Sequence, residues 1–207
     1  MRVDGPPPGE ELNPGQATEP RAAASVILLR DTAPGLQVLL VKRNPKASFM
    51  GGAWVFPGGA VQEADGGPEG AALRELEEEA AISLGGAGEL VPFSRWVTPV
   101  EVTVRFDTCF YLARAPAGAE AACDGQECVE ARWLEPAAAL AAGRTGELFL
   151  VFPTVKHLEQ LARLESVEEA LATARGRSVE PVLPRVVERD GAAHVLLPGE
   201  PGYDGPS

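Results

Sequence analysis

Residues 58–82 read GGAVQEADGGPEGAALRELEEEAAI, and this stretch decides the fold that we expect. It follows a short strand predicted over 53–56, which the next residues, Pro-Gly-Gly, break sharply. Pro68 suits the first turn of a helix, where its missing N–H would have no partner in any case. We therefore predict a helix from Pro68 to about Ser83, ended by the glycine pair 85–86.

The predicted helix carries three carboxylates on one face. Glu75, Glu78 and Glu79 stand at i, i+3, i+4 spacing, which places them within one turn. Like charges at this spacing destabilise an isolated helix by roughly 0.2–0.5 kcal/mol a pair, a cost that a divalent cation would offset. Oxygen ligands of this kind suit Mg²⁺ or Mn²⁺ better than zinc. By themselves, three glutamates also fit a solvated acidic face.

The residues around the carboxylates favour a metal site over a solvated face. Glycines directly after a strand let the backbone approach a metal or a phosphate, and they free the Gly59 carbonyl to act as a ligand. Arg74 lies among the glutamates and can hold one of them through a bidentate pair that fixes its rotamer.

With these neighbours, the stretch resembles the Nudix box, in which Gly, five residues, an acid and a spacer precede R-E-U-x-E-E-x-G-U, with U apolar. The match covers residues 59–65 and 74–82. Ala81 replaces the later glycine of the motif, and the spacer before the arginine is one residue longer than usual. Asp65 stands where glutamate is typical, or Glu63 if the gap lies elsewhere. These departures concern loop geometry, because the helix keeps all its carboxylates.

Segments outside the box narrow the resemblance. AWVFPGG at 53–59, WVTP at 96–99 and RFDT at 105–108 are similar to a Nudix branch that includes the peroxisomal coenzyme A diphosphatases and their bacterial relatives. The likeness covers roughly residues 22–164. It implies an α/β fold, the Nudix α/β/α sandwich with a mixed sheet, followed by a C-terminal helical extension.

The resemblance also implies roles for particular residues. One main-chain group and three side chains would bind Mg²⁺ or Mn²⁺ across the substrate diphosphate: the Gly59 carbonyl, Glu75, Glu78 and Glu79. Glu75 and Glu78 would serve catalysis with Arg74, since metal and carboxylate together activate a water for attack on phosphorus. A further acid often precedes the last sheet strand in this family. Glu127 occupies that place, as a ligand, a base or an ordinary loop residue.

The rest of the chain predicts one domain with strands first and helices later. Alternating and β-branched runs predict strands at 22–30, 36–42, 90–97, 103–113 and 129–134, the first two forming a hairpin around the turn 31–35. Helices are predicted at 136–142, 154–164 and 167–175, the last with Ser166 and Glu169 at capping-box spacing. Short strands are expected around Pro184 and Gly191. We expect a disordered leader at 1–20, the domain at 21–197 with C-terminal helices from about 153, and a flexible tail at 198–207.

Charge and cysteine content limit the function classes. The net charge of −12 argues against a protein that coats nucleic acid, because such binding needs Lys and Arg to neutralise phosphates. No apolar run reaches the ~18 residues of a membrane span. Three cysteines are too few for a disulfide scaffold, and Cys123 and Cys128 lack the further ligands of a zinc knuckle, so we expect a reducing cytoplasm. The expected partner is a small nucleoside diphosphate substrate, and a homodimer is left open.

Several other residues carry two interpretations each. Arg105 and Asp107 alternate on one face of a predicted strand and fit either ligand contact or a structural ion pair. Lys42 and Arg43 close a strand near the site, within the cationic segment 21–46, and could touch phosphates. Three tryptophans fit the core better than a base-stacking role, namely Trp54, Trp96 and Trp133. Two isolated histidines are assigned no chemistry, namely His157 and His194.

The sequence therefore predicts Mg²⁺-dependent hydrolysis of a phosphoanhydride bond in a nucleoside diphosphate linked to another group. The branch resemblance points to coenzyme A or an acyl derivative, whose 3′-phosphate could meet the cationic segment. Hydrolysis of ADP-ribose, NADH or dinucleoside polyphosphates is the alternative within the family. A non-catalytic Nudix domain that binds a nucleotide is the other alternative, although it would not need all three helix carboxylates.

Overall fold

A computed structural model describes residues 2–3, 17–33, 35–47, 49–85, 89–189 and 192–204. Its central sheet has the strand order β4-β3-β2-β7-β6-β9, with β5 also paired to β2 and β8 to β3. The β2–β7 and β6–β9 pairs are parallel and the others antiparallel, so the sheet is mixed as predicted. The strands are β2 (Arg21–Thr32), β3 (Gly35–Arg43), β4 (Trp54–Val55), β5 (Gly58–Ala60), β6 (Val91–Val97), β7 (Phe106–Arg114), β8 (Cys128–Leu134) and β9 (Pro181–Val182).

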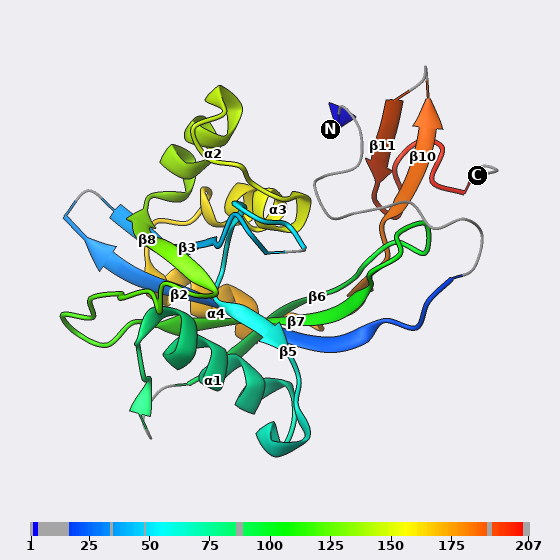
Figure 1. The fold of residues 1–207 in the computed structure, drawn as a ribbon. Helices are drawn as coiled ribbons and strands as arrows, with labels where there is room; N and C mark the ends of the chain where they lie inside the picture. Colours follow the sequence, from blue (N-terminus) through cyan, green and yellow to red (C-terminus); the bar gives the residue numbers. More distant parts are fainter. Residues whose placement is uncertain are drawn as a thin grey trace.

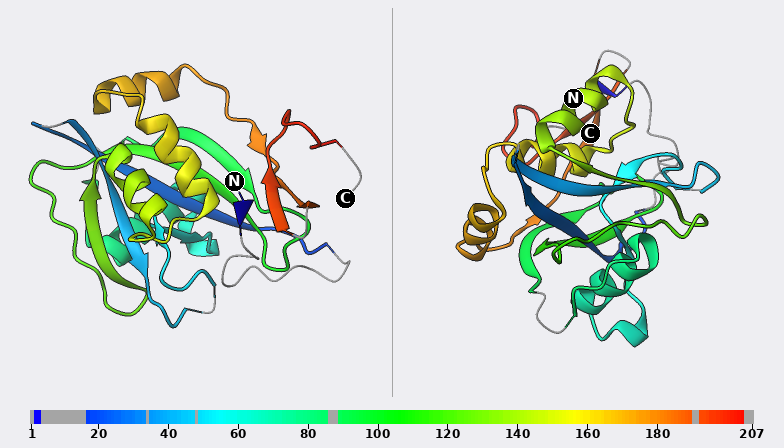
Figure 2. Two further views of the ribbon diagram at one scale, coloured as in Figure 1. Left: turned by 90° about the horizontal axis from the view of Figure 1, so that it is seen from above. Right: turned by 90° about the vertical axis from the view of Figure 1, so that its left-hand side faces the viewer.

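Helices cover both faces of this sheet, which confirms the α/β/α sandwich (Figures 1 and 2). The middle of strand β2, Val26–Leu29, is apolar at every position, and its packing explains why. Val26 and Leu28 belong to one core cluster with Leu76 of α1, whereas Ile27 and Leu29 belong to a second cluster with the later helices. A strand buried on both faces needs apolar side chains at every position. The helices are α1 (Pro68–Ala80), α2 (Pro136–Thr145), α3 (Phe152–Leu161) and α4 (Val167–Arg175), with a short 3₁₀ helix η1 (Glu63–Asp65) before α1.

Helix α1 ends at Ala80, three residues before the predicted end at Ser83. The reason is Ala81, the residue at the later glycine position of the motif. Its φ of 55° and ψ of 31° are left-handed, and its N–H bonds the Glu77 carbonyl as a C-cap. The chain therefore turns away before the glycine pair 85–86, of which Gly86 lies outside the described residues.

The C-terminal helices follow the prediction closely, with one local difference. Ser166 Oγ accepts from the Glu169 N–H at 3.2 Å, as a capping residue does. The Glu169 carboxylate, however, accepts from the Glu165 N–H and not from that of Ser166.

The strand predicted from Thr103 begins only at Phe106, because the Val102 N–H closes a turn onto the Pro99 carbonyl.

A small second sheet lies beside the main one, in the order β1-β11-β10. It comprises β1 (Arg2–Val3), β10 (Arg185–Arg189) and β11 (Ala192–Leu196), so the short strands expected near Pro184 and Gly191 are present.

Within the expected leader, Arg2–Val3 pairs with β11 and Thr18 Oγ1 donates to the Thr103 carbonyl. Within the expected tail, the Tyr203 hydroxyl donates to the Leu183 carbonyl at 2.7 Å. Parts of the expected leader, turns and tail lie outside the described residues, namely 1, 4–16, Pro34, Gly191 and 205–207. Among the residues described, no helix combines the length and apolar character that a membrane span requires.

The left-handed conformation of Ala81 gives a first testable prediction. The Cβ of an L-residue opposes this conformation, so Ala81→Gly should raise the free energy of unfolding by about 1 kcal/mol. Ala80→Gly is the matched control, since Ala80 is helical and buried, and that variant should lose about 1 kcal/mol or more. Urea unfolding of both variants measures the difference. A less stable Ala81→Gly protein would contradict the argument.

Candidate active site

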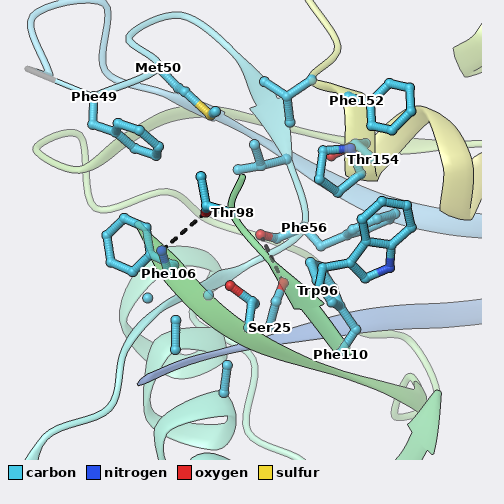
Figure 3. A pocket seen from close by; sticks show the side chains of 18 of the residues that line it. Ser25, Phe49, Met50, Phe56, Trp96, Thr98, Phe106, Phe110, Phe152 and Thr154 are labelled. Carbon is cyan, nitrogen blue, oxygen red and sulfur yellow. Dashed lines mark hydrogen bonds between the residues drawn. The ribbon is translucent and has the colours of Figure 1, made fainter. Parts of the chain in front are cut away.

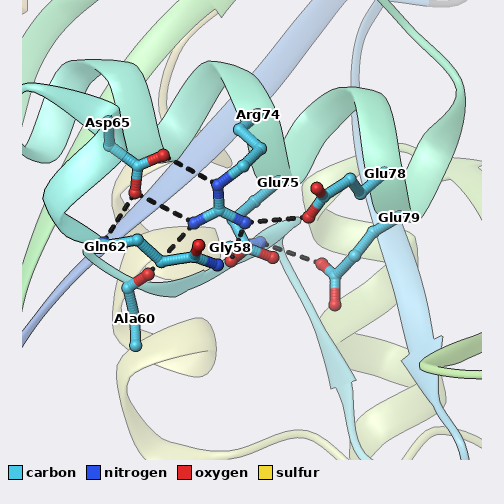
Figure 4. Close-up of polar contacts among 8 residues, drawn as sticks. All are labelled: Gly58, Ala60, Gln62, Asp65, Arg74, Glu75, Glu78 and Glu79. Atoms are coloured by element: carbon cyan, nitrogen blue, oxygen red, sulfur yellow. Dashed lines mark hydrogen bonds and ion pairs between the residues drawn. The ribbon is translucent and has the colours of Figure 1, made fainter.

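Arg74 is the centre of a polar cluster that joins α1 to the segment after β5 (Figure 4). Its Nε and Nη2 donate to the two carboxylate oxygens of Asp65, at 2.8 and 3.0 Å. Its Nη1 donates to Glu75 Oε1 and to Glu78 Oε2, both at 2.8 Å. Nη2 also donates to the Ala60 carbonyl at 3.1 Å. One guanidinium therefore orders three carboxylates and a main-chain turn.

Asp65 is the bidentate partner of Arg74, so the predicted bidentate pair between Arg74 and a glutamate is wrong in this detail. Asp65, rather than Glu63, accordingly takes the place of the first acid of the motif. The hydrogen bonds from Arg74 lower the pKa of Asp65, which also accepts the Gln62 N–H at 2.7 Å. The glycine pair 66–67, with φ of 69° and 136°, then carries the longer spacer into α1 through conformations that other residues rarely adopt.

The glycines of β5 allow α1 to lie against the strand. A Cβ at Gly59 would lie only 2.6 Å from Glu75 Cδ, so any side chain there would displace the carboxylate. A Cβ at Gly58 would lie 2.7 Å from the Cα of Ser25 on β2. The Gly58 N–H donates to Glu79 Oε2 at 2.9 Å (Figure 4). The sequence predicted a close approach of this main chain to a metal or a phosphate, and the structure shows its close approach to two glutamates of α1.

Three carboxylates converge next to the Arg74 cluster. Glu75, Glu79 and Glu127 each offer an oxygen, and these atoms lie within 4.8 Å of one another. Burial raises the pKa of Glu75, against the bond from Arg74. Glu79 is 1% exposed, and burial raises its pKa to about 7. Glu78 lies outside this group, with a side chain 59% exposed and bonded to Arg74.

A rigid loop delivers Glu127 to the two helix carboxylates. The Asp124 carboxylate accepts the main-chain N–H groups of Gln126, Glu127 and Cys128 at 2.9–3.1 Å. Asn44 clamps the same loop from the end of β3, through its N–H to the Glu127 carbonyl and its side chain to the Gln126 carbonyl. The family resemblance implied a further acid near this place, and Glu127 lies directly before β8, whereas the supporting roles of Asp124 and Asn44 were missed. The Asp-Gly pair 124–125, typical of a tight turn, was the available signal.

This donor set fits a hard divalent cation. Like charges this close oppose one another, and a doubly charged ion would remove that repulsion. All three donors are carboxylate oxygens, which Mg²⁺ and Mn²⁺ prefer. Gly59, predicted as a ligand through its carbonyl, lines the same cavity as Glu75 and Glu127.

A pocket of about 390 Å³ opens beside these carboxylates. Its lining is mainly apolar and aromatic, with Trp96, Phe106 and Phe152 around it (Figure 3). Arg43 also lines the pocket, as predicted for a residue near the site, but Lys42 is not among the lining residues. The volume lies within the range of sites for small molecules. The pocket thus places an apolar chamber next to the three convergent carboxylates.

The other residues noted in the sequence have structural partners. Asp107 forms an ion pair with Arg95. Arg105 precedes strand β7 and donates to the Thr98 carbonyl at 3.0 Å. Of the three tryptophans, Trp54 and Trp96 are buried as predicted, and Trp133 is partly buried beneath the Arg30 guanidinium.

His157 is fully buried and plays no part in the carboxylate site. Its Nε2 lies 2.7 Å from Ser94 Oγ, and its ring lies 4.4 Å from that of Phe110 between ring centroids. Burial lowers its pKa to about 3, so the ring is neutral at physiological pH. It lies in the core with a polar contact to Ser94.

Comparison with known proteins identifies the family. Residues 19–152 match the family model described as NUDIX domain, which is more than half of the chain. The chain belongs to the Nudix hydrolase family. It is 28% identical, over 209 aligned residues, to a Caenorhabditis elegans protein named "Putative nudix hydrolase 7", with 83% of this chain and 70% of the relative covered. It is 42% identical over 74 residues to an uncharacterized Nudix hydrolase, NudL, of Citrobacter koseri, covering 36% of this chain and about a third, 35%, of that relative.

Solved structures show the same fold. The crystal structure of a Nudix hydrolase from Alicyclobacillus acidocaldarius has a TM-score of 0.71 at 26% identity, covering 79% of this chain and 99% of that one. A Caenorhabditis elegans Ap4A hydrolase has a TM-score of 0.55 at 18% identity, with 69% and 96% covered. The Nudix domain of Shewanella oneidensis NrtR, complexed with ADP ribose, has a TM-score of 0.55 at 22% identity, with 73% and 91% covered. At these identities the last two show likeness of fold alone.

The burial of Glu79 predicts a pH-dependent stability of the metal-free protein. Its pKa rises from 4.5 to about 7 on folding, so the folded state holds this proton more tightly. That contribution is complete below pH 4.5 and is lost as the pH rises through about 7. Glu79→Gln, which cannot ionise, should therefore unfold at higher urea concentration than the wild type at pH 8 in chelator.

At pH 5 the same two proteins should differ little, because Glu79 is then largely protonated in the folded state. Added Mg²⁺ should stabilise the wild type at pH 8 more than the variant, since a cation competes with the proton for this site. A wild type that is more stable than Glu79→Gln at pH 8 without metal would refute the assignment.

Proposed function

We propose that this Nudix hydrolase uses Mg²⁺ or Mn²⁺ to cleave a phosphoanhydride bond in a nucleoside diphosphate linked to another group. The observation that carries the proposal is the convergence of Glu75, Glu79 and Glu127 at a pocket with an apolar chamber. When bound, the cation supplies neutralisation of the diphosphate charge and activation of water. Because phosphoryl transfer depends mainly on positioning and charge neutralisation, such a site meets its chief requirements.

Each residue of the site has a distinct proposed task. Glu75 and Glu79 are buried and fixed, by Arg74 and by the Gly58 N–H, so we assign them as metal ligands. Glu127 is the exposed member of the group on a rigid loop, and we assign it the orientation of the attacking water. Gly59 adds its carbonyl as a ligand.

Glu78 and Arg74 complete the proposed machinery. Glu78 and Glu75 accept from the same Nη1 atom of Arg74, so their carboxylates lie side by side. We keep Glu78 in the ligand set as its solvent-facing member. Arg74 acts as a positioning residue that sets the rotamers of both glutamates.

Metal binding and turnover should fail together when a ligand is removed. Glu75→Gln and Glu78→Gln are expected to lower kcat/KM by more than about 100-fold, because outer-sphere partners alone are worth 10–100-fold in such sites. Glu77→Gln is the matched control on the same helix, since Glu77 is exposed and lies outside the convergent group. Calorimetric titration with Mg²⁺ and product analysis, both with and without chelator, provide the measurements. Full turnover in excess chelator would exclude the metal mechanism.

For the substrate we propose coenzyme A or an acyl derivative, cut to 3′,5′-ADP and a phosphopantetheine product. The segments at 53–59, 96–99 and 105–108 support this by resemblance, and Arg21 and Arg43 on the pocket lining offer cations for the 3′-phosphate. We also propose a cytoplasmic location, supported by the three free cysteines of the chain.

A competition experiment tests the substrate proposal. Coenzyme A, ADP-ribose, NADH and diadenosine polyphosphates are offered at equal concentration with Mg²⁺, and kcat/KM is obtained for each. We expect the highest value for coenzyme A or its acyl derivative, by about tenfold. A higher value for any of the others defeats the coenzyme A proposal and leaves the hydrolase mechanism intact.

A further inference from the structure

Part of the pocket wall comes from residues beyond the span that matches the family model. That span ends at residue 152, whereas the pocket lining includes Pro184, Val186 and Val195. Val186 lies on β10 and Val195 on β11. The two are register partners in the antiparallel hairpin, so their side chains lie on the same face of it. One face of the hairpin thus presents an apolar pair to the pocket.

The hairpin is held against the main domain by defined contacts. Strand β9 continues the main sheet next to β6, where Val182 pairs with Trp96, itself a pocket residue. The Val186 N–H donates to Glu101 Oε2 at 3.3 Å, and Arg185 lies 3.9 Å from the other oxygen of the same carboxylate. Glu101 belongs to the loop after β6, which also supplies Thr98 and Pro99 to the pocket. These contacts fix the hairpin at the pocket rim.

The rest of the pocket lining has a consistent chemistry. The residues that line the pocket away from the carboxylates and the two arginines are mainly apolar, and Figure 3 shows aromatic rings and Met50 directed around one space. Apart from the hydroxyls of Ser25, Thr98, Thr108 and Thr154, these side chains offer few hydrogen-bonding partners. A polar group against them would lose hydrogen bonds to water, which costs free energy. An alkyl or acyl group would gain from the transfer out of water.

We propose that the hairpin β10–β11 forms an apolar subsite for the group that the substrate carries beyond its diphosphate, and that Val186 and Val195 determine specificity for it. The occupant is an alkyl or acyl portion of that group. The subsite shares one pocket with Gly59, Glu75 and Glu127, so a diphosphate at the metal site would extend its second substituent along this wall. This inference rests on the proposed function, which supplies the diphosphate at the carboxylate end.

The test uses adenosine 5′-diphosphate esters with straight alkyl chains of two, six or ten carbons. Their nucleoside and diphosphate are constant, so any trend comes from the chain alone. Each methylene that leaves water supplies up to about a fourfold gain. For the wild type we expect kcat/KM to rise at least about tenfold from the two-carbon to the six-carbon ester.

The discriminating variant is Val186→Thr with Val195→Thr, which keeps the shape of both side chains and replaces one methyl of each with a hydroxyl. In it, the ratio of kcat/KM between the six-carbon and two-carbon esters should fall by at least about threefold, since the aromatic part of the lining remains. Leu183→Ala is the matched control, since that exposed side chain lies just before the hairpin and outside the pocket lining, and the ratio should persist. Val195→Ala is a second variant and should lower the same ratio. Thermal melting of every variant detects a fold defect.

The dissociation constants of the same esters, measured by calorimetry in chelator, separate this inference from the proposed function. One outcome is that no ester is hydrolysed with Mg²⁺, but long chains bind the wild type more tightly than short chains do, and this preference is weaker in the double variant. In that case the hydrolase proposal fails and the subsite stands. If chain length has no effect on binding or kcat/KM in the wild type, the subsite is overturned. It is also overturned if the double variant keeps the full preference for long chains. The chain would then bind elsewhere, and another group, such as the base, would lie against the hairpin.

Discussion

The site depends on one ion cluster, in which the Arg74 guanidinium holds Asp65, Glu75 and Glu78 and reaches the Ala60 carbonyl. A helix that gathers carboxylates at i, i+3, i+4 spacing opposes its own formation, and burial of two of them adds to that cost. Arg74 lowers the repulsion with a charge that cannot titrate away. It also ties the helix to the strand-loop segment before it, so the geometry of these three acids follows from one side chain.

The remaining free-energy cost of these carboxylates is offset by apolar packing on the same helix. A neighbouring stripe of α1 buries Ala72, Leu76 and Ala80 against the central sheet, and apolar burial of this kind dominates the free energy of folding. Glu79 remains inside the protein with a raised pKa, stabilised by the Gly58 N–H but not by a cation of the chain at hydrogen-bond distance among the contacts described. Stability at this position has been exchanged for a ligand that a metal can use.

Local sequence patterns predicted the parts of the structure that depend on neighbours in the chain. The β2–β3 hairpin and helix α1 follow from periodicity and turn chemistry. The segment Gly58–Ala60, expected only as a break after a strand, forms β5. The place of Glu127, just before β8, was implied by the family resemblance and not by a local pattern. The support of that loop by Asn44 could not be read, because the two segments lie more than eighty residues apart. The left-handed conformation of Ala81 could not be predicted for another reason. Alanine does not favour this conformation, and only the family motif has a glycine at this position.

Because the β10–β11 hairpin lies outside the span that matches the family model, the charged residues of the site and part of the apolar pocket wall come from different parts of the chain. Arg74 and the carboxylates of the site lie between β5 and β8, whereas residues that line the pocket extend as far as β11. Replacing or losing the last segment would leave the acidic helix and its strand untouched. Descendants of one ancestral sequence could thereby acquire new substrates by exchanging their ends, while the reaction itself is inherited without change.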